Sequence, residues 1–423
     1  MAVDFTLTPE QLAERAAARE FAEKHLVGVE ALIAGIPTPE ERLLATRPVY
    51  REMVRAGYLK AMIPADLGGT FRSVLDLVVV GEEISHGDMS VSCSLFSSGL
   101  GFYPVLIGGS PEQRRRLLAP FLADDGTPMA ALAFSEDGGS ANFDAPDPSA
   151  GFTTTARRDG DEWVISGRKA FTTNGYGWEG EGPEFFSVAC RVGDGPSDQT
   201  LSVIVVPGDA AGISYGSSLD TMGHRACLSP RVVFDGVRVP AENLVGRPGD
   251  GIDLLSRTFA WSGVTVGAEA VCVMQQAFDA AREFAVTERR RGAVPVIEHQ
   301  NVAYMLADMK MRLEAARYLV WKAAHRLDET AGADMELSNT AKVYCSELAV
   351  QVVYDAMRLV GVESYANERP FTRMLQDALA LPLYDGGNMG MRRRAIAQVL
   401  ASDGYDSRAA AENRPAAVSG ARG

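Results

Sequence analysis

Cysteine and histidine are scarce in this 423-residue sequence, with five residues of each type. The cysteines, at positions 93, 190, 227, 272 and 345, have no Cys-x-x-Cys spacing, and the histidines are equally dispersed. Zinc and disulfide frameworks need clustered ligands or paired thiols, so this scatter argues against both. We therefore expect no metal site, and a reducing, cytoplasmic location.

Positive charge is also in deficit, and long apolar runs are missing. The sequence has 41 Lys and Arg against 55 Asp and Glu, a formal net charge of -14, which disfavours nucleic acid as a partner. No run approaches the roughly 18 apolar residues that span a bilayer, and the first residues do not form a signal peptide. Neither a G-x-G-x-x-G motif nor a P-loop is present. We expect no membrane partner and no nucleotide fold of those two types.

Three helix starts repeat one pattern in the first third of the chain. Residues 8–11, 38–41 and 110–113 each place a hydroxyl at the N-cap, proline next and Glu or Gln at the third helical position. An apolar stretch, residues 75–84, follows the Gly68-Gly69 turn and predicts a core helix. The N-terminal part, residues 1–128, is predicted to be helical.

The pattern changes near residue 130. Runs rich in β-branched and aromatic residues, parted by Gly, Pro and Asp, predict strands at 152–157, 163–166, 185–190, 201–206 and 231–240. Long segments without proline, 252–291, 297–331 and 335–360, then match the helices of an antiparallel bundle. The predicted fold is α+β, with a helical domain (1–128), a central β-barrel or sandwich domain (129–246) and a C-terminal four-helix bundle (247–405). Residues 406–423 are expected to be a disordered tail.

The most informative segment is residues 383–394, where one carboxylate stands on a glycine-rich break before a basic stretch. Asp385 is the side chain there that can take a proton. Gly386 and Gly387 would let a flat substrate or cofactor approach the main chain. If helix resumes after Gly387, Arg392 lies two turns on, where its charge would keep Asp385 ionised. Taken alone, the segment also fits a helix break with a surface acid and a basic patch.

Four motifs, in order, resemble those of the acyl-CoA dehydrogenase superfamily of flavoenzymes. They are residues 133–140 (Ala-Phe-Ser-Glu-Asp-Gly-Gly-Ser), 169–175 (Lys-Ala-Phe-Thr-Thr-Asn-Gly), 233–246 at the end of the β region, and 288–291 together with 297–300. The resemblance covers nearly the whole chain. It implies the three-domain fold of that superfamily, with bound FAD.

The resemblance also implies where FAD is held. It places Ser135 and the amides of its glycine-rich turn at the flavin pyrimidine edge and phosphates, Phe171 against the isoalloxazine, and Thr173 at N5. Arg289 would reach the pyrophosphate of a neighbouring subunit's FAD. Without the resemblance, each motif has an ordinary explanation: a β-turn, a core aromatic, a charged helix end. The full set of expected cofactor residues is Phe134, Ser135, Gly139, Ser140, Phe171, Thr173, Arg289, His299, Gln300, Gly386 and Gly387.

Departures from the superfamily bear on the reaction. Acyl-CoA dehydrogenases usually carry Glu-Gly-Thr at the catalytic base, whereas this chain has Asp385-Gly386-Gly387. They commonly show Phe-Asp-x-x-Arg in the helix after the β domain, whereas residues 259–263 here read Phe-Ala-Trp-Ser-Gly. Because both charged groups are missing, a thioester of coenzyme A should bind poorly.

These departures resemble the nitroalkane oxidases, a group within the same superfamily that uses an aspartate. The most specific match is residues 382–388, followed by Gly390 and three arginines. The resemblance implies that Asp385 is the base, Arg392 its charge partner, and Ser262 a hydrogen-bond donor beside Asp385. For Ser262 the alternative is a helix serine that bonds its own backbone.

The activity implied is an FAD-dependent oxidase that converts neutral nitroalkanes to aldehydes or ketones, with release of nitrite and hydrogen peroxide. Its partners would be a small nitro compound, molecular oxygen and three further copies of the chain in a homotetramer. Two alternatives stay open: an acyl-CoA or acyl-carrier dehydrogenase that uses Asp385 as base, and a flavin-holding protein without turnover. The sequence does not name the physiological nitro compound.

Overall fold

The computed structural model describes residues 5–145, 147, 149–412 and 414. Its contacts divide the chain into two compact units. The bundle unit comprises Met1–Lys24, Ser73–Met89 and Gly263–Gly423, and the sheet unit comprises His25–Arg72 and Ser90–Ser262. The division at residues 128, 246 and 405 stays a prediction.

The helices of the sheet unit begin where the sequence predicts. Thr38 accepts a hydrogen bond from Glu41 N at the start of α3, and Ser110 and Gln113 form a reciprocal capping box at α6. These bonds satisfy backbone donors that a helix start leaves unpaired. The helical elements are α2 (Val29–Ile33), α3 (Pro39–Arg55), η1 (Lys60–Met62), η2 (Ala65–Leu67), α5 (Met89–Gly108), α6 (Pro111–Leu118), η3 (Ala119–Leu122), α7 (Ser197–Thr200) and η4 (Ala241–Asn243).

Helix α5 is long and apolar enough to cross a membrane by length and composition. Sequence reasoning passed over it because serines interrupt its apolar run. Its most apolar window is 72% buried inside the structure. Core helices of folded domains share this composition, so α5 is explained by burial.

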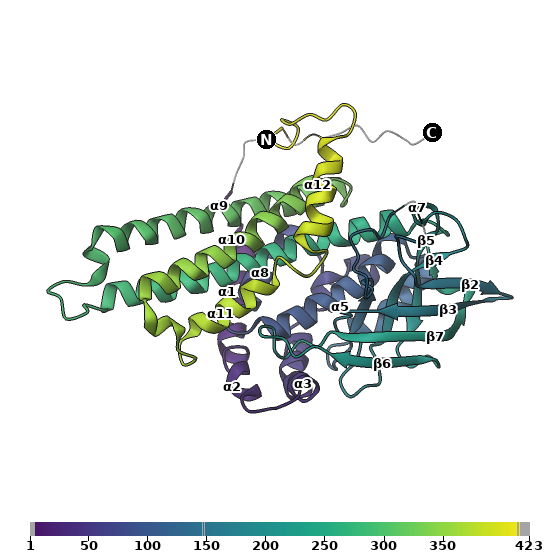
Figure 1. The fold of residues 1–423 in the computed structure, drawn as a ribbon, viewed down its shortest axis with the longest axis horizontal. Coiled ribbons are helices and arrows are strands. Elements are labelled where there is room, and N and C mark those ends of the chain that lie inside the picture. The colour runs from purple at the N-terminus through teal and green to yellow at the C-terminus, as the bar shows by residue number, and fades with distance from the viewer. Residues whose placement is uncertain (1–4, 146, 148, 413, 415–423) are drawn as a thin grey trace. The chain divides into compact units, whose positions relative to one another are not determined.

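The β region forms one mixed sheet in the part of the chain described here. Its order is β6-β7-β3-β2-β4-β5-β8, and β1 pairs with β4. The pairs β1–β4 and β2–β4 are parallel and the others antiparallel. Figure 1 shows β2, β3, β7 and β6 as neighbouring arrows. The strands are β1 (Ala130–Ala133), β2 (Thr155–Asp159), β3 (Glu162–Lys169), β4 (Phe185–Val192), β5 (Leu201–Pro207), β6 (Ile213–Ser218), β7 (Pro230–Pro240) and β8 (Leu244–Val245).

Alternating side chains explain why these segments form the sheet. Along β7, Val232, Phe234, Val237 and Val239 are buried in one cluster with residues of β3, β4 and β5. Strand β4 is buried at six successive positions, as expected for a strand covered on both faces. The predicted strands at 163–166, 185–190, 201–206 and 231–240 are therefore confirmed, whereas the run at 152–157 becomes a strand only from Thr155.

The bundle unit contains the long helices expected at the C-terminus. Its elements are α1 (Pro9–His25), α4 (Val74–Ile84), most of α8 (Gly251–Thr287), η5 (Val296–Glu298), α9 (Gln300–Thr330), α10 (Glu336–Val360), η6 (Val362–Tyr365), α11 (Pro370–Ala380), η7 (Asn388–Arg392) and α12 (Arg393–Leu400). Figure 1 shows α9 and α10 side by side. Gly267 of α8 lets Val320 of α9 approach, since an added Cβ would lie 2.8 Å from it. The antiparallel bundle is thus confirmed.

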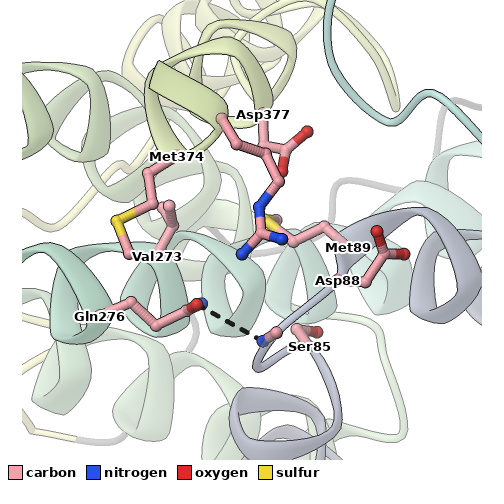
Figure 2. Close-up of a pocket in the computed structure, with 9 residues that line it drawn as sticks. Ser85, Asp88, Met89, Val273, Gln276, Met374 and Asp377 are labelled. Carbon is pink, nitrogen blue, oxygen red and sulfur yellow. Dashed lines mark hydrogen bonds between the residues drawn. The ribbon is translucent and has the colours of Figure 1, made fainter. Parts of the chain in front are cut away.

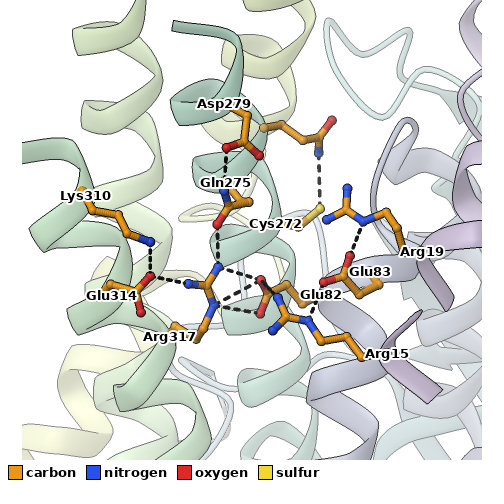
Figure 3. A network of polar contacts seen from close by, with 11 residues as sticks. Arg15, Arg19, Glu82, Glu83, Cys272, Gln275, Asp279, Lys310, Glu314 and Arg317 are labelled. Carbon is orange, nitrogen blue, oxygen red and sulfur yellow. Dashed lines mark hydrogen bonds and ion pairs between the residues drawn. The ribbon is translucent and has the colours of Figure 1, made fainter. Parts of the chain in front are cut away.

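A buried ionic network joins four helices of this unit (Figure 3). Arg317 of α9 donates to Glu82 of α4 at 2.8 Å and to Gln275 of α8 at 2.8 Å. Arg15 of α1 pairs with both Glu82 and Glu83 of α4. Because each buried charge has an opposite partner, the network can hold these helices in register without leaving an uncompensated charge.

The predicted disordered tail, residues 406–423, lies outside the described residues at 413 and from 415 onward. In the described part, Arg414 pairs with Asp406 and Glu412.

Candidate active site

Asp385 stands at a sharp break between two helical segments of the bundle unit. Its φ is +54° and that of Gly386 is +68°, so the chain enters the left-handed region at two successive residues. Glycine adopts this conformation without steric penalty and aspartate tolerates it better than most residues. After the break, residues 388–392 form one π-helical turn before α12. The predicted helix break is confirmed.

Arg392 binds Asp385 through three hydrogen bonds. Its Nη2 donates to Oδ2 of Asp385 at 2.6 Å and to the backbone carbonyl at 2.8 Å, and its Nε donates to that carbonyl at 3.0 Å. Both side chains are 2% exposed. Burial lowers the pKa of Arg392 from its ordinary value, and the Asp385 charge opposes that shift. The pair is therefore a buried carboxylate held by a guanidinium, as the spacing of seven residues predicts.

Helix α10 supports this pair from the other side. Asn339 accepts a hydrogen bond from Arg392 Nη1 at 2.9 Å. On α8, a Cβ added to Gly263 would lie 3.0 Å from Arg392 Nη1 and 3.0 Å from Ser338 Oγ. That is closer than ordinary van der Waals contact, so a side chain at 263 would press on the guanidinium. The glycine that stands where the family has an arginine is thus packed against the guanidinium that binds Asp385.

Two ionisable residues near Asp385 were missed by sequence reasoning. Lys342 of α10 is fully buried and donates to Tyr384 O at 2.9 Å and to Asn388 Oδ1 at 2.8 Å. Glu269 of α8 is 2% exposed and lies 2.7 Å from the Tyr384 hydroxyl. The available signal was a charged residue in an otherwise apolar helix stretch, such as Ala341-Lys342-Val343. That signal does not say which distant segment the charge contacts.

Ser262 lies in the sheet unit, on α8. It is buried, and its hydroxyl donates to the carbonyl of Phe259 at 3.3 Å, within its own helix. The alternative of a serine bonding its own backbone is therefore observed. Its predicted place as a donor beside Asp385 stays a prediction.

The sheet unit carries six of the predicted cofactor residues. Phe171 is 56% exposed with φ +55°, so a large aromatic face is presented on an unusual backbone. Thr173 lies two residues on, with its hydroxyl 2.8 Å from Ser229 Oγ. An exposed aromatic with a nearby hydroxyl suits a flat, hydrogen-bonding ring such as a flavin.

The glycine-rich turn after β1 is open on its outer side. A Cβ added to Gly139, at φ +88°, would meet no atom of the described residues within 4 Å. Ser135 and Ser140 place their hydroxyls 3.5 Å apart across the turn. Phe134 is buried against other phenylalanines, and its carbonyl accepts from Lys169. The turn thus offers hydroxyls and approachable backbone to a phosphate-bearing ligand, with Phe134 packed behind it.

The bundle unit carries the remaining predicted cofactor residues. Arg289, His299 and Gln300 are exposed between α8 and α9, and Gln300 Nε2 donates to Tyr304 at 2.8 Å. Gly387 approaches Leu383 closely, since an added Cβ would lie 2.9 Å from its carbonyl oxygen. Arg289 is exposed two residues beyond the end of α8, where its guanidinium is available to an anionic group. The donors present in the two units therefore fit FAD.

A small cavity in the bundle unit is separate from these residues (Figure 2). It lies among α8, α11 and the turn after α4, and Gln276 accepts a hydrogen bond there from Gly87 N at 3.4 Å. No residue predicted for catalysis or cofactor binding lines it. The lining residues are Ser85, Gly87, Asp88, Met89, Val273, Gln276, Arg373, Met374 and Asp377.

Comparison with known proteins gives consistent matches over the chain. Family models described as the acyl-CoA dehydrogenase N-terminal, middle and C-terminal domains match residues 8–125, 131–237 and 249–401. The chain is 38% identical to the nitroalkane oxidase of Podospora anserina, over 96% of this chain and 98% of that protein. It is 37% identical to the nitroalkane oxidase of Fusarium oxysporum, over 96% and 97% respectively. A solved nitroalkane oxidase structure crystallised with 1-nitrooctane has a TM-score of 0.94 at 36% identity, covering 97% of this chain and 100% of that one.

Proposed function

This chain belongs to the acyl-CoA dehydrogenase family, and from that premise we propose that it is an FAD-dependent nitroalkane oxidase. It converts neutral nitroalkanes to aldehydes or ketones and releases nitrite and hydrogen peroxide. The observation that carries the proposal is the buried Asp385–Arg392 pair, with Gly263 packed on the guanidinium. The nitroalkane oxidases described above are similar to the chain over almost its whole length.

Asp385 acts as the base that removes the α-proton of the substrate. A nitro group spreads the resulting negative charge over its oxygens, so a carboxylate can perform the transfer in a pocket shielded from water. Arg392 binds one carboxylate oxygen and the backbone carbonyl of the same residue, which fixes the carboxylate relative to its backbone. Such fixed orientation favours proton transfer because little geometry remains to be organised.

FAD, when bound, takes up the electron pair of the deprotonated substrate and passes it to molecular oxygen. Phe171 would contact the ring system, and Thr173 and Ser135 would hydrogen-bond its polar edge. The turn containing Gly139 and Ser140 would approach the phosphates. Gly386 and Gly387 pack against Arg392 and the Leu383 carbonyl, where an added Cβ would lie 3.4 Å and 2.9 Å away, and so they allow the tight turn that presents Asp385.

The chain assembles as a homotetramer in which Arg289 reaches the cofactor of a neighbouring copy. Large apolar side chains are exposed on α9 and α10, at Tyr304, Met311, Tyr344 and Tyr354. Tyr304 and Met311 are seven residues apart and so share one helix face. Exposed aromatic residues of this kind are typical of subunit interfaces. Sedimentation velocity of the yellow holoprotein should give four chains per particle, and a monomer would contradict the assembly.

The activity is tested with Asp385→Asn, which keeps the shape of the side chain but removes the proton acceptor. Oxygen consumption with neutral nitroethane should fall by roughly 100- to 10,000-fold, the range for losing a general base. The preformed nitronate anion needs no deprotonation and should still be oxidised. Asp403→Asn, at an exposed aspartate, is the matched control and should leave both rates unchanged. An equal loss with both substrates would show that Asp385 is not the base.

A further inference from the structure

Lys342 is a buried amine whose position none of the roles above explains. Its side chain is fully buried on α10, and no ion pair joins it to a carboxylate in the described part of the chain. Its two acceptors are the Tyr384 carbonyl at 2.9 Å and Asn388 Oδ1 at 2.8 Å. Burying an amine away from water destabilises the folded protein unless its environment compensates. Because burial of this amine is unfavourable, we expect a role of Lys342 beyond packing.

The two acceptors lie on either side of Asp385 in the chain. The Tyr384 carbonyl belongs to the same peptide plane as the Asp385 N–H, and rotation about φ of Asp385 turns that plane. Arg392 binds the next carbonyl, that of Asp385 itself, whose plane turns with ψ. Two buried cations therefore restrain the two peptide planes that define the backbone conformation of the base.

That conformation needs restraint. At φ +54°, Asp385 occupies the left-handed region, which is less favourable for an L-residue than the right-handed region even though aspartate tolerates it better than most. Release of the Tyr384 carbonyl would let the peptide relax and swing the carboxylate away from its present place. Asn388 adds a second tie, because its Nδ2 donates to Ser346 Oγ at 2.9 Å on α10.

One face of α10 carries three side chains of this restraint, and Arg392 of η7 completes it. Asn339 contacts Arg392, Lys342 contacts Tyr384 and Asn388, and Ser346 contacts Asn388. Spacings of three and four residues place these side chains in one row along the helix. Burial lowers the pKa of Lys342 to about 7, with Arg392 acting in the same direction and Asp385 and Glu347 against it. A neutral amine still has N–H donors, so the hydrogen bonds persist above that pH.

We propose that Lys342 is a positioning residue for the base: by binding the Tyr384 carbonyl and Asn388, it holds Asp385 in the left-handed conformation that presents its carboxylate to the substrate. The inference rests on the proposed function for its kinetic consequence. Its structural consequence, the backbone conformation of Asp385, does not depend on which substrate is used.

The test compares the purified holoenzyme of Lys342→Met with the wild type. Methionine has similar length and no N–H donor, so it removes both bonds while filling the space. With neutral nitroethane, kcat/KM per bound FAD should fall roughly 10- to 100-fold, the scale of a 1 Å misplacement. With the preformed nitronate it should change less than about threefold, because no proton is removed. Lys310→Met, at a half-exposed lysine of α9, is the control and should match the wild type.

An equal loss of kcat/KM with nitroethane and with the nitronate overturns the proposal, because a general structural defect slows both reactions alike. No loss with either substrate overturns it as well. If Lys342→Met yields no folded protein, Lys342→Leu, which also lacks an N–H donor, replaces it in the same comparison. A crystal structure of the variant gives a second readout: Asp385 is expected to leave the left-handed region, and an unchanged φ would also overturn the proposal. A wild-type enzyme inactive on nitroethane would instead defeat the proposed function, and the crystal structure would still decide the role of Lys342.

Discussion

Replacing Glu269 by Gln should change how stability depends on pH. Glu269 is buried on α8, its Oε2 lies 2.7 Å from the Tyr384 hydroxyl, and its Oε1 has no hydrogen-bond partner in the described part of the chain. Burial raises its pKa to about 8. The Tyr384 hydrogen bond opposes this, whereas the charges of Asp385 and Asp377 reinforce it. Near neutral pH the folded protein therefore holds Glu269 protonated, which leaves Asp385 without a second anion beside it.

The stability contributed by Glu269 depends on pH because the folded and unfolded chains hold its proton over different pH ranges. Above about pH 4.5 the unfolded chain releases this proton, while the folded chain keeps it up to about pH 8. The contribution of Glu269 to stability is thus fully present below about pH 4.5 and is lost as the pH rises toward 8. At about 1.4 kcal/mol per pKa unit, the whole interval corresponds to about 5 kcal/mol. Between about pH 5 and pH 8 the loss should be about 3 to 4 kcal/mol.

Glutamine cannot ionise, yet its amide oxygen can still accept the Tyr384 hydrogen bond. Urea unfolding of both proteins from about pH 5 to pH 8 measures the difference. Between about pH 5 and pH 8, the free energy of unfolding of Glu269→Gln should rise relative to that of the wild type by about 3 to 4 kcal/mol. Glu314→Gln is the control: hydrogen bonds and charges of Lys310 and Arg317 outweigh burial and lower the Glu314 pKa, so its contribution is lost only in acid. Parallel curves for Glu269→Gln and wild type would refute the reasoning.

Two further outcomes concern the active site. Arg392→Lys should keep a higher kcat/KM for nitroethane than Arg392→Met but a lower one than the wild type. Lysine keeps the charge but lacks the planar guanidinium that binds Oδ2 and the carbonyl of Asp385. Equal kcat/KM values in the two variants would contradict this role of the guanidinium. Octanoyl-CoA should neither reduce the flavin anaerobically nor inhibit, because Ala260 and Gly263 offer no charged partner to a thioester of coenzyme A. Rapid flavin bleaching by octanoyl-CoA, with no nitrite from nitroethane, would favour the dehydrogenase alternative.

Local sequence patterns predict the features of the site that lie close together in the chain. The glycine pair after Asp385 predicts a chain break, and the spacing to Arg392 predicts their contact, both of which the structure confirms. Arg392 follows Asp385 by seven residues, but the left-handed turn at Asp385 and Gly386 and the π-helical turn at 388–392, rather than a continuous α-helix, bring the two side chains together. The cofactor residues come from a resemblance in four motifs, and the structure places them on turns and helix ends in both units, some exposed, such as Phe171 and Arg289, and others, such as Phe134, buried.

Local sequence patterns did not predict the residues that contact Arg392 and Tyr384 from distant parts of the chain. Lys342 is 42 residues from Tyr384 in the chain, Asn339 is 53 from Arg392, and Tyr384 is 115 from Glu269. Lys342 and Asn339 lie within α10 and Glu269 within α8, and the apolar periodicity of these two segments predicts the helices but not which distant segments they contact. A buried charge is compatible with the helix only because a distant segment supplies its acceptors.

By itself the sequence determined the capped helix starts, the strands β3, β4, β5 and β7, and the break that carries Asp385, because caps, side-chain alternation and glycine act over a few residues. It also determined the family, because four motifs in order need no coordinates. Only the tertiary structure decided that Asp385, rather than a glycine alone, turns left-handed, and that one face of α10 holds it there. The physical reason is that packing between helices sets those contacts, and packing depends on side chains far apart in the chain.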